Sequence, residues 1–195
     1  MHIRNDVVSR SSRYLAISFL VICSQIIWLL SLGRNWFCTC GSLRLWAGMD
    51  PAQNSQQFFD PYSLLHFAFG CGLDLWLTAV RPHFTLARRA AYAVMSSVFW
   101  EMCENLPFVI GILGTEGTQL AYSGDSIVNS LSDAFTGLIG FAVASRISTP
   151  VTVSAMLALE VPTFTWIGDS VVAGVLRYRH RWRREMQRTP PGQLL

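Results

Sequence analysis

The chain has 195 residues, of which 51% are hydrophobic and only 14% are charged, and its mean hydropathy is +0.35. Soluble domains carry about 25% charged residues, so this composition excludes an ordinary soluble domain and favours a membrane protein. The net charge of +3 comes from arginines, which lie between apolar runs and at the chain ends. That pattern follows membrane topology and argues against nucleic acid as a partner.

The apolar residues form runs that predict an all-α polytopic transmembrane helical bundle with about five membrane segments. A span needs about 20 predominantly apolar residues. A polar N-terminal tail, residues 1–13, precedes four clear runs and one interrupted run: 14–32, 58–80, 90–113, 124–145 and 151–175. The first run could be either a signal peptide or a retained membrane helix. Its length and the spans that follow favour the retained helix. Gly137 and Gly140 predict close packing of the fourth span.

The arginine distribution predicts the orientation of these spans. The N-terminal tail, the loop 81–89 and Arg146 are expected on the cytoplasmic side because they carry arginines. The basic tail 176–195 reaches the same side only if the last segment breaks and turns back, which we expect between Pro162 and Asp169. A basic tail at that surface would bind anionic lipid.

The third run contains a cluster of polar residues between Trp100 and Pro107. Glu101, Glu104 and Asn105 are spaced i, i+3, i+4, so one helix face holds all three. Polar and ionised groups are costly in hydrocarbon, so this face must contact protein, water or a ligand. We therefore take Glu101 and Glu104 as candidate catalytic residues.

Polar residues of two other runs are expected at a similar depth, in the outer half of the membrane. A rise of ~1.5 Å per residue places His66 and Asp133 near the level of Glu101. No arginine is expected near the membrane midplane among these acids, so either some are protonated or a cation neutralises them. The convergence predicts one shared site. Three further members of this site are candidate metal ligands: His66, Asp125 and Asp133. Three more are expected to support it as polar residues: Asp60, Asn105 and Asn129.

Each of these residues also has a structural interpretation. His66 could be a packing histidine, and the acids could lock neighbouring helices together by hydrogen bonds. Asp60 and Asp125 lie near helix starts, where N-capping is the expected role for each alone. Ser126 and Ser130 are interpreted as packing residues.

The polar loop 33–57 carries Cys38 and Cys40. In an oxidising compartment this pair could form a labile disulfide or supply thiolate metal ligands, and an inert pair is equally compatible with the spacing. The other three cysteines lie within apolar runs and are interpreted as small packing residues.

Several motifs occur in order between Gly33 and Asp169. They are Cys38-x-Cys40-Gly41, Asn54-Ser55-Gln56, Asp60-x-Tyr62, His66-x-x-x-Gly70, Trp100-Glu101-x-x-Glu104-Asn105-x-Pro107, Tyr122-x-Gly124-Asp125-Ser126-x-x-Asn129-Ser130-x-x-Asp133 and Gly140-Phe141. This series resembles an uncharacterised family of multi-pass bacterial inner-membrane proteins, a domain of unknown function. The resemblance implies location in the bacterial inner membrane and no particular activity. The layout is also distantly similar to that of VanZ-like membrane proteins.

The chain departs from the family pattern at two potential ligand positions. The family usually has histidine at positions 57 and 69, where this chain has Gln57 and Phe69. With fewer nitrogen ligands, the site suits zinc less well than a hard divalent metal ion or a proton relay.

Three functions are compatible with these residues. The first is a membrane enzyme acting on a lipid-linked substrate at the outer face, with Glu101 or Glu104 as general base and a divalent metal as cofactor. The second is a small proton-coupled transporter that uses the same acids as a relay. The third is a non-catalytic scaffold or assembly factor that binds a membrane protein partner.

Overall fold

The structure is a computed structural model that describes residues 2–113 and 122–168, together with residues 170, 172, 176 and 179. Over this part of the chain the fold is all-helical, and a single isolated β-bridge pairs Trp46 with Phe59. The helices are α1 (His2–Ser31), α2 (Ser63–Val80), α3 (Leu86–Glu104), α4 (Pro107–Leu113), α5 (Ile127–Ala144) and α6 (Thr149–Ile167).

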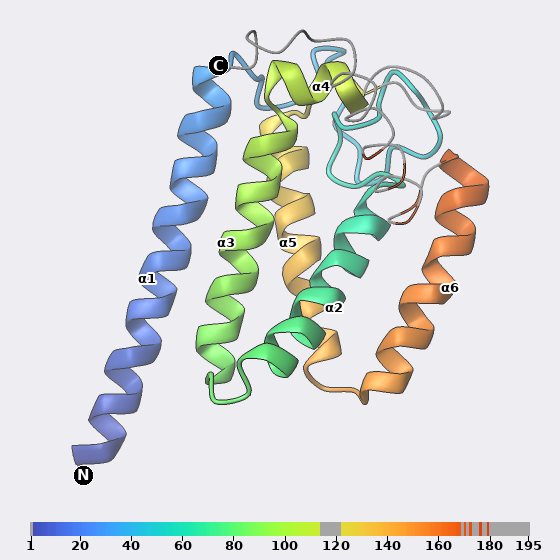
Figure 1. The fold of residues 1–195 in the computed structure, drawn as a ribbon. Coiled ribbons are helices and arrows are strands. Elements are labelled where there is room, and N and C mark those ends of the chain that lie inside the picture. Colours follow the sequence, from blue (N-terminus) through green and yellow to red (C-terminus); the bar gives the residue numbers. More distant parts are fainter. Residues whose placement is uncertain are drawn as a thin grey trace, which may run out of the picture.

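The long helices run side by side, and the short helix α4 lies across one end of the bundle (Figure 1). The main helix pair is α2 with α5, while α1 packs on α3, α3 on α5, and α6 on α2. The loop between α1 and α2 lies at the same end as α4, opposite the N-terminus (Figure 1). This end, called the loop end below, carries the candidate site.

Within the described part of the chain, three helices are long and apolar enough to cross a membrane: α1 over Ser11–Ser31, α2 over Ser63–Val80 and α5 over Ile127–Ala144. Large apolar side chains on α1 and α2 remain exposed in the bundle, among them Leu15, Phe19 and Trp76. Such a surface suits lipid rather than water. These features indicate a helical membrane protein. The helices α3 and α6 are not among these three, so the count of five membrane segments is not confirmed.

The predicted third span, 90–113, is divided into two helices. The helix α3 ends at Glu104, and α4 begins at Pro107. Proline lacks a backbone N–H and disfavours helical geometry in the residue before it, but it fits the first position of a new helix. Glu104 and Asn105 therefore lie at a helix end, where their side chains can reach the loops.

The last segment is predicted to break between Pro162 and Asp169, and its helix ends close to the second of these residues. The helix α6 continues through Pro162 and ends at Ile167, with Gly168 in the left-handed conformation at φ 69°. Glycine adopts this conformation without steric cost, so it commonly ends helices. The described residues do not include Asp169. The predicted return of the chain and the basic tail 176–195 also lie outside them, apart from isolated positions.

The contact between α2 and α5 is a close approach of two backbones. A Cβ atom built on Gly70 would lie 1.8 Å from the carbonyl oxygen of Gly137, and one on Gly140 would lie 2.0 Å from the carbonyl oxygen of Phe67. Only glycine fits at such positions, which is how small residues allow membrane helices to approach each other. The consequence for the site is that His66 of α2 lies beside Asp133 of α5.

Candidate functional site

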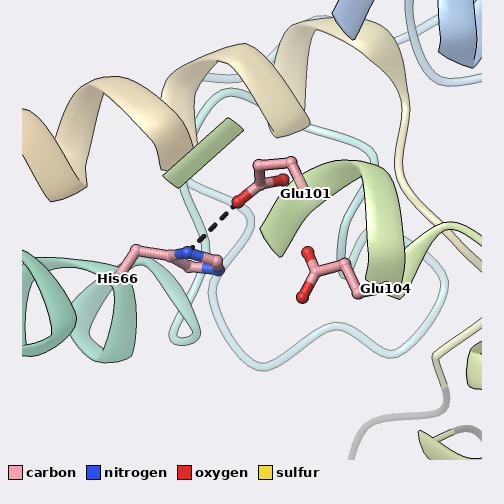
Figure 2. Close-up of side chains that lie close together, drawn as sticks. All are labelled: His66, Glu101 and Glu104. Carbon is pink, nitrogen blue, oxygen red and sulfur yellow. Dashed lines mark ion pairs between the residues drawn. The ribbon is translucent and has the colours of Figure 1, made fainter. Parts of the chain in front are cut away.

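Three buried side chains from α2 and α3 form the centre of the site: His66, Glu101 and Glu104. Each offers one ligand atom, and these atoms lie within 4.8 Å of one another. His66 Nδ1 lies 3.2 Å from Glu101 Oε1 (Figure 2). The two glutamates come from one helical turn, so the i, i+3 spacing places both beside the imidazole.

The orientation of Glu101 is set from two other helices. Ser130 of α5 donates its hydroxyl to Glu101 Oε2 at 2.8 Å, and Gln25 of α1 donates its amide to Ser130 Oγ at 2.8 Å. The other oxygen, Glu101 Oε1, is buried and accepts no hydrogen bond from the residues described. This arrangement leaves one carboxylate oxygen, next to His66, able to bind a proton or a cation.

Asp133 of α5 lies on the other side of the imidazole. Its Oδ1 accepts a hydrogen bond from Ser63 Oγ at 2.7 Å, and its Oδ2 lies 3.9 Å from His66 Nε2. The second distance is too long for a hydrogen bond. His66 is therefore placed between two carboxyl groups, and the nearer one belongs to Glu101.

Asn105 connects the end of α3 to Asp125, which precedes α5. The Asn105 amide donates to Asp125 Oδ2, and its carbonyl oxygen accepts from the backbone N–H of Asp125 at 2.9 Å. The Tyr122 hydroxyl also donates to Asp125 Oδ2, at 3.0 Å. Burial raises the pKa of Asp125 to about 6, although the hydrogen bonds from Asn105 and Tyr122 lower it. The carboxyl groups of Asp125 and Glu104 also interact electrostatically, so Asp125 extends the site toward the loop end.

Asp60 organises the loop before α2. Its carboxylate accepts hydrogen bonds from the backbone N–H groups of Ser55 and Tyr62, both at 2.8 Å, and from the Asn129 amide at 3.3 Å. Burial raises the pKa of Asp60, and these hydrogen bonds lower it. Asp60 and Asn129 thus join the loop to α5.

Of the two N-capping roles considered, the one for Asp125 is not observed, whereas the Asp60 carboxylate accepts the backbone N–H of Tyr62 at the start of α2. Tyr62 occupies the N-cap position of α2, and Ser126 occupies that of α5. The Ser126 hydroxyl accepts from the backbone N–H of Asn129 at 3.2 Å. Because serine fills this role, the carboxylate of Asp125 is free to bind Asn105 and Tyr122.

Five carboxyl groups are buried at this end of the bundle without an arginine ion pair in the described part of the chain: Asp60, Glu101, Glu104, Asp125 and Asp133. The nearby Arg34 donates to the backbone carbonyls of Ser123 and Asn105, at 3.0 and 3.3 Å. Buried carboxylates cannot all be ionised without a compensating charge. The cluster therefore requires shared protons or a bound cation.

The two loop cysteines lie in a neighbouring feature. Cys38 and Cys40 form a disulfide with each other. They line a cavity of about 320 Å³ whose wall also includes Arg34 and Asp125. The cysteines thus border the site on its loop side, whereas the three central ligand candidates lie deeper.

Several contributors to the site were not identified as such from sequence. Ser130 was interpreted as a packing residue, and Gln25, Ser63, Tyr122 and Arg34 had no assigned role. One of them carries a usable signal, because Gln25 is the only amide side chain between residues 14 and 32. An amide in an apolar span is expected to find a hydrogen-bond partner on another helix.

The apolar helices and the buried histidine–carboxylate cluster together define a helical membrane protein with a polar site at one end. Residues 29–181 match the family described as "Protein of unknown function (DUF2585)", and the chain belongs to this family.

Its relatives include bacterial proteins named UPF0314 protein. One from Brucella anthropi is 37% identical over 161 residues, 82% of each chain. One from Paracoccus denitrificans is 34% identical over 168 residues, 86% of each chain, and one from Sinorhizobium fredii is 36% identical over 160 residues, 80% of each. No solved structure matches the chain. The expected membership of an uncharacterised bacterial family is confirmed.

Proposed function

We propose that this protein is a membrane enzyme in which His66, Glu101 and Glu104 bind a divalent metal ion. The observation that carries the proposal is the approach of their three ligand atoms to within 4.8 Å of one another in a buried setting. Two further observations add support. Glu101 Oε1 accepts no hydrogen bond among the described residues and lies 3.2 Å from His66 Nδ1, and the described acid cluster has no arginine ion pair. A divalent cation would compensate the buried negative charge.

The donor set favours a hard or borderline metal ion. One imidazole and two carboxylates form an oxygen-rich group, which suits Mn²⁺ or Mg²⁺ better than a structural zinc. Asp133 and Asp125 flank this group and are proposed as additional ligands or as residues that orient the first three. Ser130 would hold Glu101 in place through its 2.8 Å hydrogen bond, a typical role for a residue behind a metal ligand.

We assign the chemistry to hydrolysis or group transfer on a lipid-linked substrate at the outer face of the membrane. A bound divalent ion polarises a carbonyl or phosphoryl oxygen and lowers the pKa of a bound water. Glu104 would give one oxygen to the ion and keep its second oxygen as the general base, and its neighbour Asp125 borders the cavity at the loop end.

The proposed location is the bacterial inner membrane, with the N-terminus in the cytoplasm and five membrane segments that include α3 and α6. The arginines of the N-terminal tail and of the loop 81–89 support this orientation. The Cys38–Cys40 disulfide at the opposite end is consistent with an oxidising compartment there.

Elemental analysis of detergent-purified protein tests the metal. Wild type is expected to hold one divalent ion per chain, and a Glu101→Gln, Glu104→Gln double variant is expected to lose it while remaining monodisperse. Glu160→Gln is the matched control, because this glutamate belongs to α6 and lies outside the cluster. Wild type without metal after growth and purification in Mn²⁺ and Mg²⁺ would refute the proposal.

One observation favours a structural role as a second candidate. The bonds from Gln25 to Ser130, from Ser130 to Glu101 and from Ser63 to Asp133 connect four helices, as expected for a scaffold locked by polar groups. Under this alternative, Glu104→Gln would lower the amount of folded protein in the membrane, and neither wild type nor variant would contain metal.

A further inference from the structure

The cavity at the loop end connects directly with the carboxylate cluster. It measures about 320 Å³ and is enclosed by three stretches of chain: residues 33–40, residues 52–56 and residues 123–125. Asp125 forms part of its wall and interacts electrostatically with Glu104. A molecule in this cavity would therefore lie next to the proposed metal site.

Arg34 gives the cavity wall a fixed positive charge. Its two terminal nitrogens donate to the backbone carbonyls of Ser123 and Asn105, and its Nε is a buried donor without a partner among the described residues. Neither carbonyl carries a net charge, so the guanidinium charge is not neutralised by these bonds. An arginine tethered in this way is positioned before any ligand arrives.

Gly124 makes room for that guanidinium. A Cβ atom at this position would lie 2.2 Å from Arg34 Cζ, and the backbone has a φ of +94°, which L residues rarely adopt. The absence of a side chain at residue 124 thus permits the arginine to lie against the backbone beside Asp125. A larger residue at position 124 would occupy the space that the guanidinium of Arg34 takes.

The N-terminus of α5 does not provide the donors of this cavity. The backbone N–H groups of Ser126, Ile127 and Val128 donate to carbonyl oxygens of residues 55, 35 and 36. The next N–H, that of Asn129, donates to the Ser126 hydroxyl. Among the residues that line the cavity, Arg34 supplies the positive charge that an anion would meet.

We propose that this cavity binds the phosphate group of the substrate on which the metal site acts, with Arg34 as the phosphate-binding residue. The inference rests on the proposed metal-dependent function. A guanidinium matches phosphate oxygens in charge and geometry. Divalent ions such as Mg²⁺ are commonly held by one or two carboxylates together with substrate phosphates. A positively charged wall beside a carboxylate-bound metal is the combination that a phosphate-bearing molecule requires.

The phosphate could belong to a soluble compound or to a lipid. Two binding measurements distinguish these sources, both on the full chain in Mn²⁺-loaded phosphatidylcholine nanodiscs. Titration calorimetry with inorganic pyrophosphate reports a soluble phosphate compound. Native mass spectrometry of nanodiscs that also contain phosphatidic acid reports a lipid phosphate, retained as a bound adduct. We expect at least one probe to bind wild type, and the one that binds identifies the source.

The variants test Arg34 directly. Arg34→Gln is expected to weaken binding of that probe at least tenfold without changing the metal content. Arg44→Gln is the matched control, because Arg44 lies in the same loop, is exposed, pairs with Asp50 at 3.7 Å and does not line the cavity. Should Arg34→Gln fail to fold, the exposed cavity residue Thr39 gives a second comparison. Thr39→Glu is then expected to repel the probe and the neutral Thr39→Gln to keep binding it.

The results distinguish the two proposals. Metal-loaded wild type that binds neither probe, or an unchanged affinity in both Arg34→Gln and Thr39→Glu, would overturn the phosphate site and leave the metal site standing. Wild type without metal that still binds a probe through Arg34 would overturn the metal proposal and support the phosphate site.

Discussion

Ser130 donates its hydroxyl to Glu101 Oε2 at 2.8 Å, and in doing so it joins α5 to α3 at the deepest point of the site. The same hydroxyl accepts a hydrogen bond from Gln25 of α1 at 2.8 Å. One small side chain therefore orients the carboxylate that lies nearest to His66. Its other oxygen is left without a hydrogen bond among the described residues, available for a ligand.

Removal of this hydroxyl should weaken metal binding more than folding. Ser130→Ala is expected to lower Mn²⁺ affinity about 10–100-fold, the usual effect of losing a residue that orients a metal ligand. The measurement is competition with a fluorescent chelator on purified protein. Ser132→Ala, a buried serine on the same helix, serves as control and should keep the wild-type affinity. Equal affinities for Ser130→Ala and wild type would contradict the role assigned to Ser130.

The glycine contact between α2 and α5 should tolerate no side chain. Gly70→Ala places a Cβ 1.8 Å from a backbone oxygen, so the helices must separate. We expect a loss of about 3 kcal/mol, the upper end of the usual cost of overpacking. Gly72→Ala, on the same helix, meets only the terminal methyl of Met156 at 3.5 Å and should be nearly neutral. Thermal unfolding in detergent checks the pair, and similar midpoints for both variants would disagree with this packing.

The composition and the apolar runs were enough to predict the helical fold and the convergence of His66 and Asp133 on Glu101. These features depend on local periodicity and on depth along a span, which sequence spacing records. The inward face of each helix could be recognised because a carboxylate in an apolar run has few tolerable surroundings. The centre of the site was therefore predictable from its own residues.

The division of the third span and the partners of its acids were not predicted. Pro107 lies within an apolar run, and hydropathy alone does not distinguish a kinked span from a helix followed by a second short helix. Likewise, the contact between Asn105 and Asp125 depends on how the loops return over the bundle. Tertiary placement decides such contacts, and no local pattern in one sequence records it.

The ion pair between Asp74 and Arg89 should stabilise the end of the bundle opposite the site. Arg89 Nη1 lies 3.0 Å from Asp74 Oδ1 and joins α3 to α2, with both side chains largely buried. Arg89→Met leaves the carboxylate unpaired, so we expect a loss toward the lower end of ~3–5 kcal/mol. Arg88→Gln, which removes the contacts over the Phe84 and Tyr92 rings, should cost roughly 0.5–1 kcal/mol. A double-mutant cycle with Asp74→Asn measures the coupling, and additive effects would count against the pair.

Asp125 should make the metal-free protein less stable as the pH rises. Burial raises its pKa from 3.8 to about 6, so the folded state keeps a proton in a range where the unfolded state has lost it. The contribution of Asp125 to stability therefore falls between about pH 4 and pH 6 and does not change further above that range. The expected size is roughly 3 kcal/mol, at about 1.36 kcal/mol per pH unit.

Asp125→Asn provides the comparison for this pH dependence. The variant has no carboxyl group at this position, so its unfolding midpoint in EDTA should fall less than that of wild type as the pH rises through the same window. Scanning calorimetry in detergent at a series of pH values gives both curves. Parallel curves would mean that Asp125 does not hold a proton in the folded state.

The Cys38–Cys40 disulfide should be detectable by alkylation. Unfolding the protein without reductant is expected to expose three reactive thiols, Cys23, Cys71 and Cys103, and reduction is expected to raise the number to five. Mass spectrometry of the intact chain counts the added groups. Because disulfides persist in oxidising compartments, this result would support an outer position for the cavity that the pair lines. Five reactive thiols before reduction, in protein isolated under thiol-blocking conditions, would remove that support and leave the orientation to the arginine distribution alone.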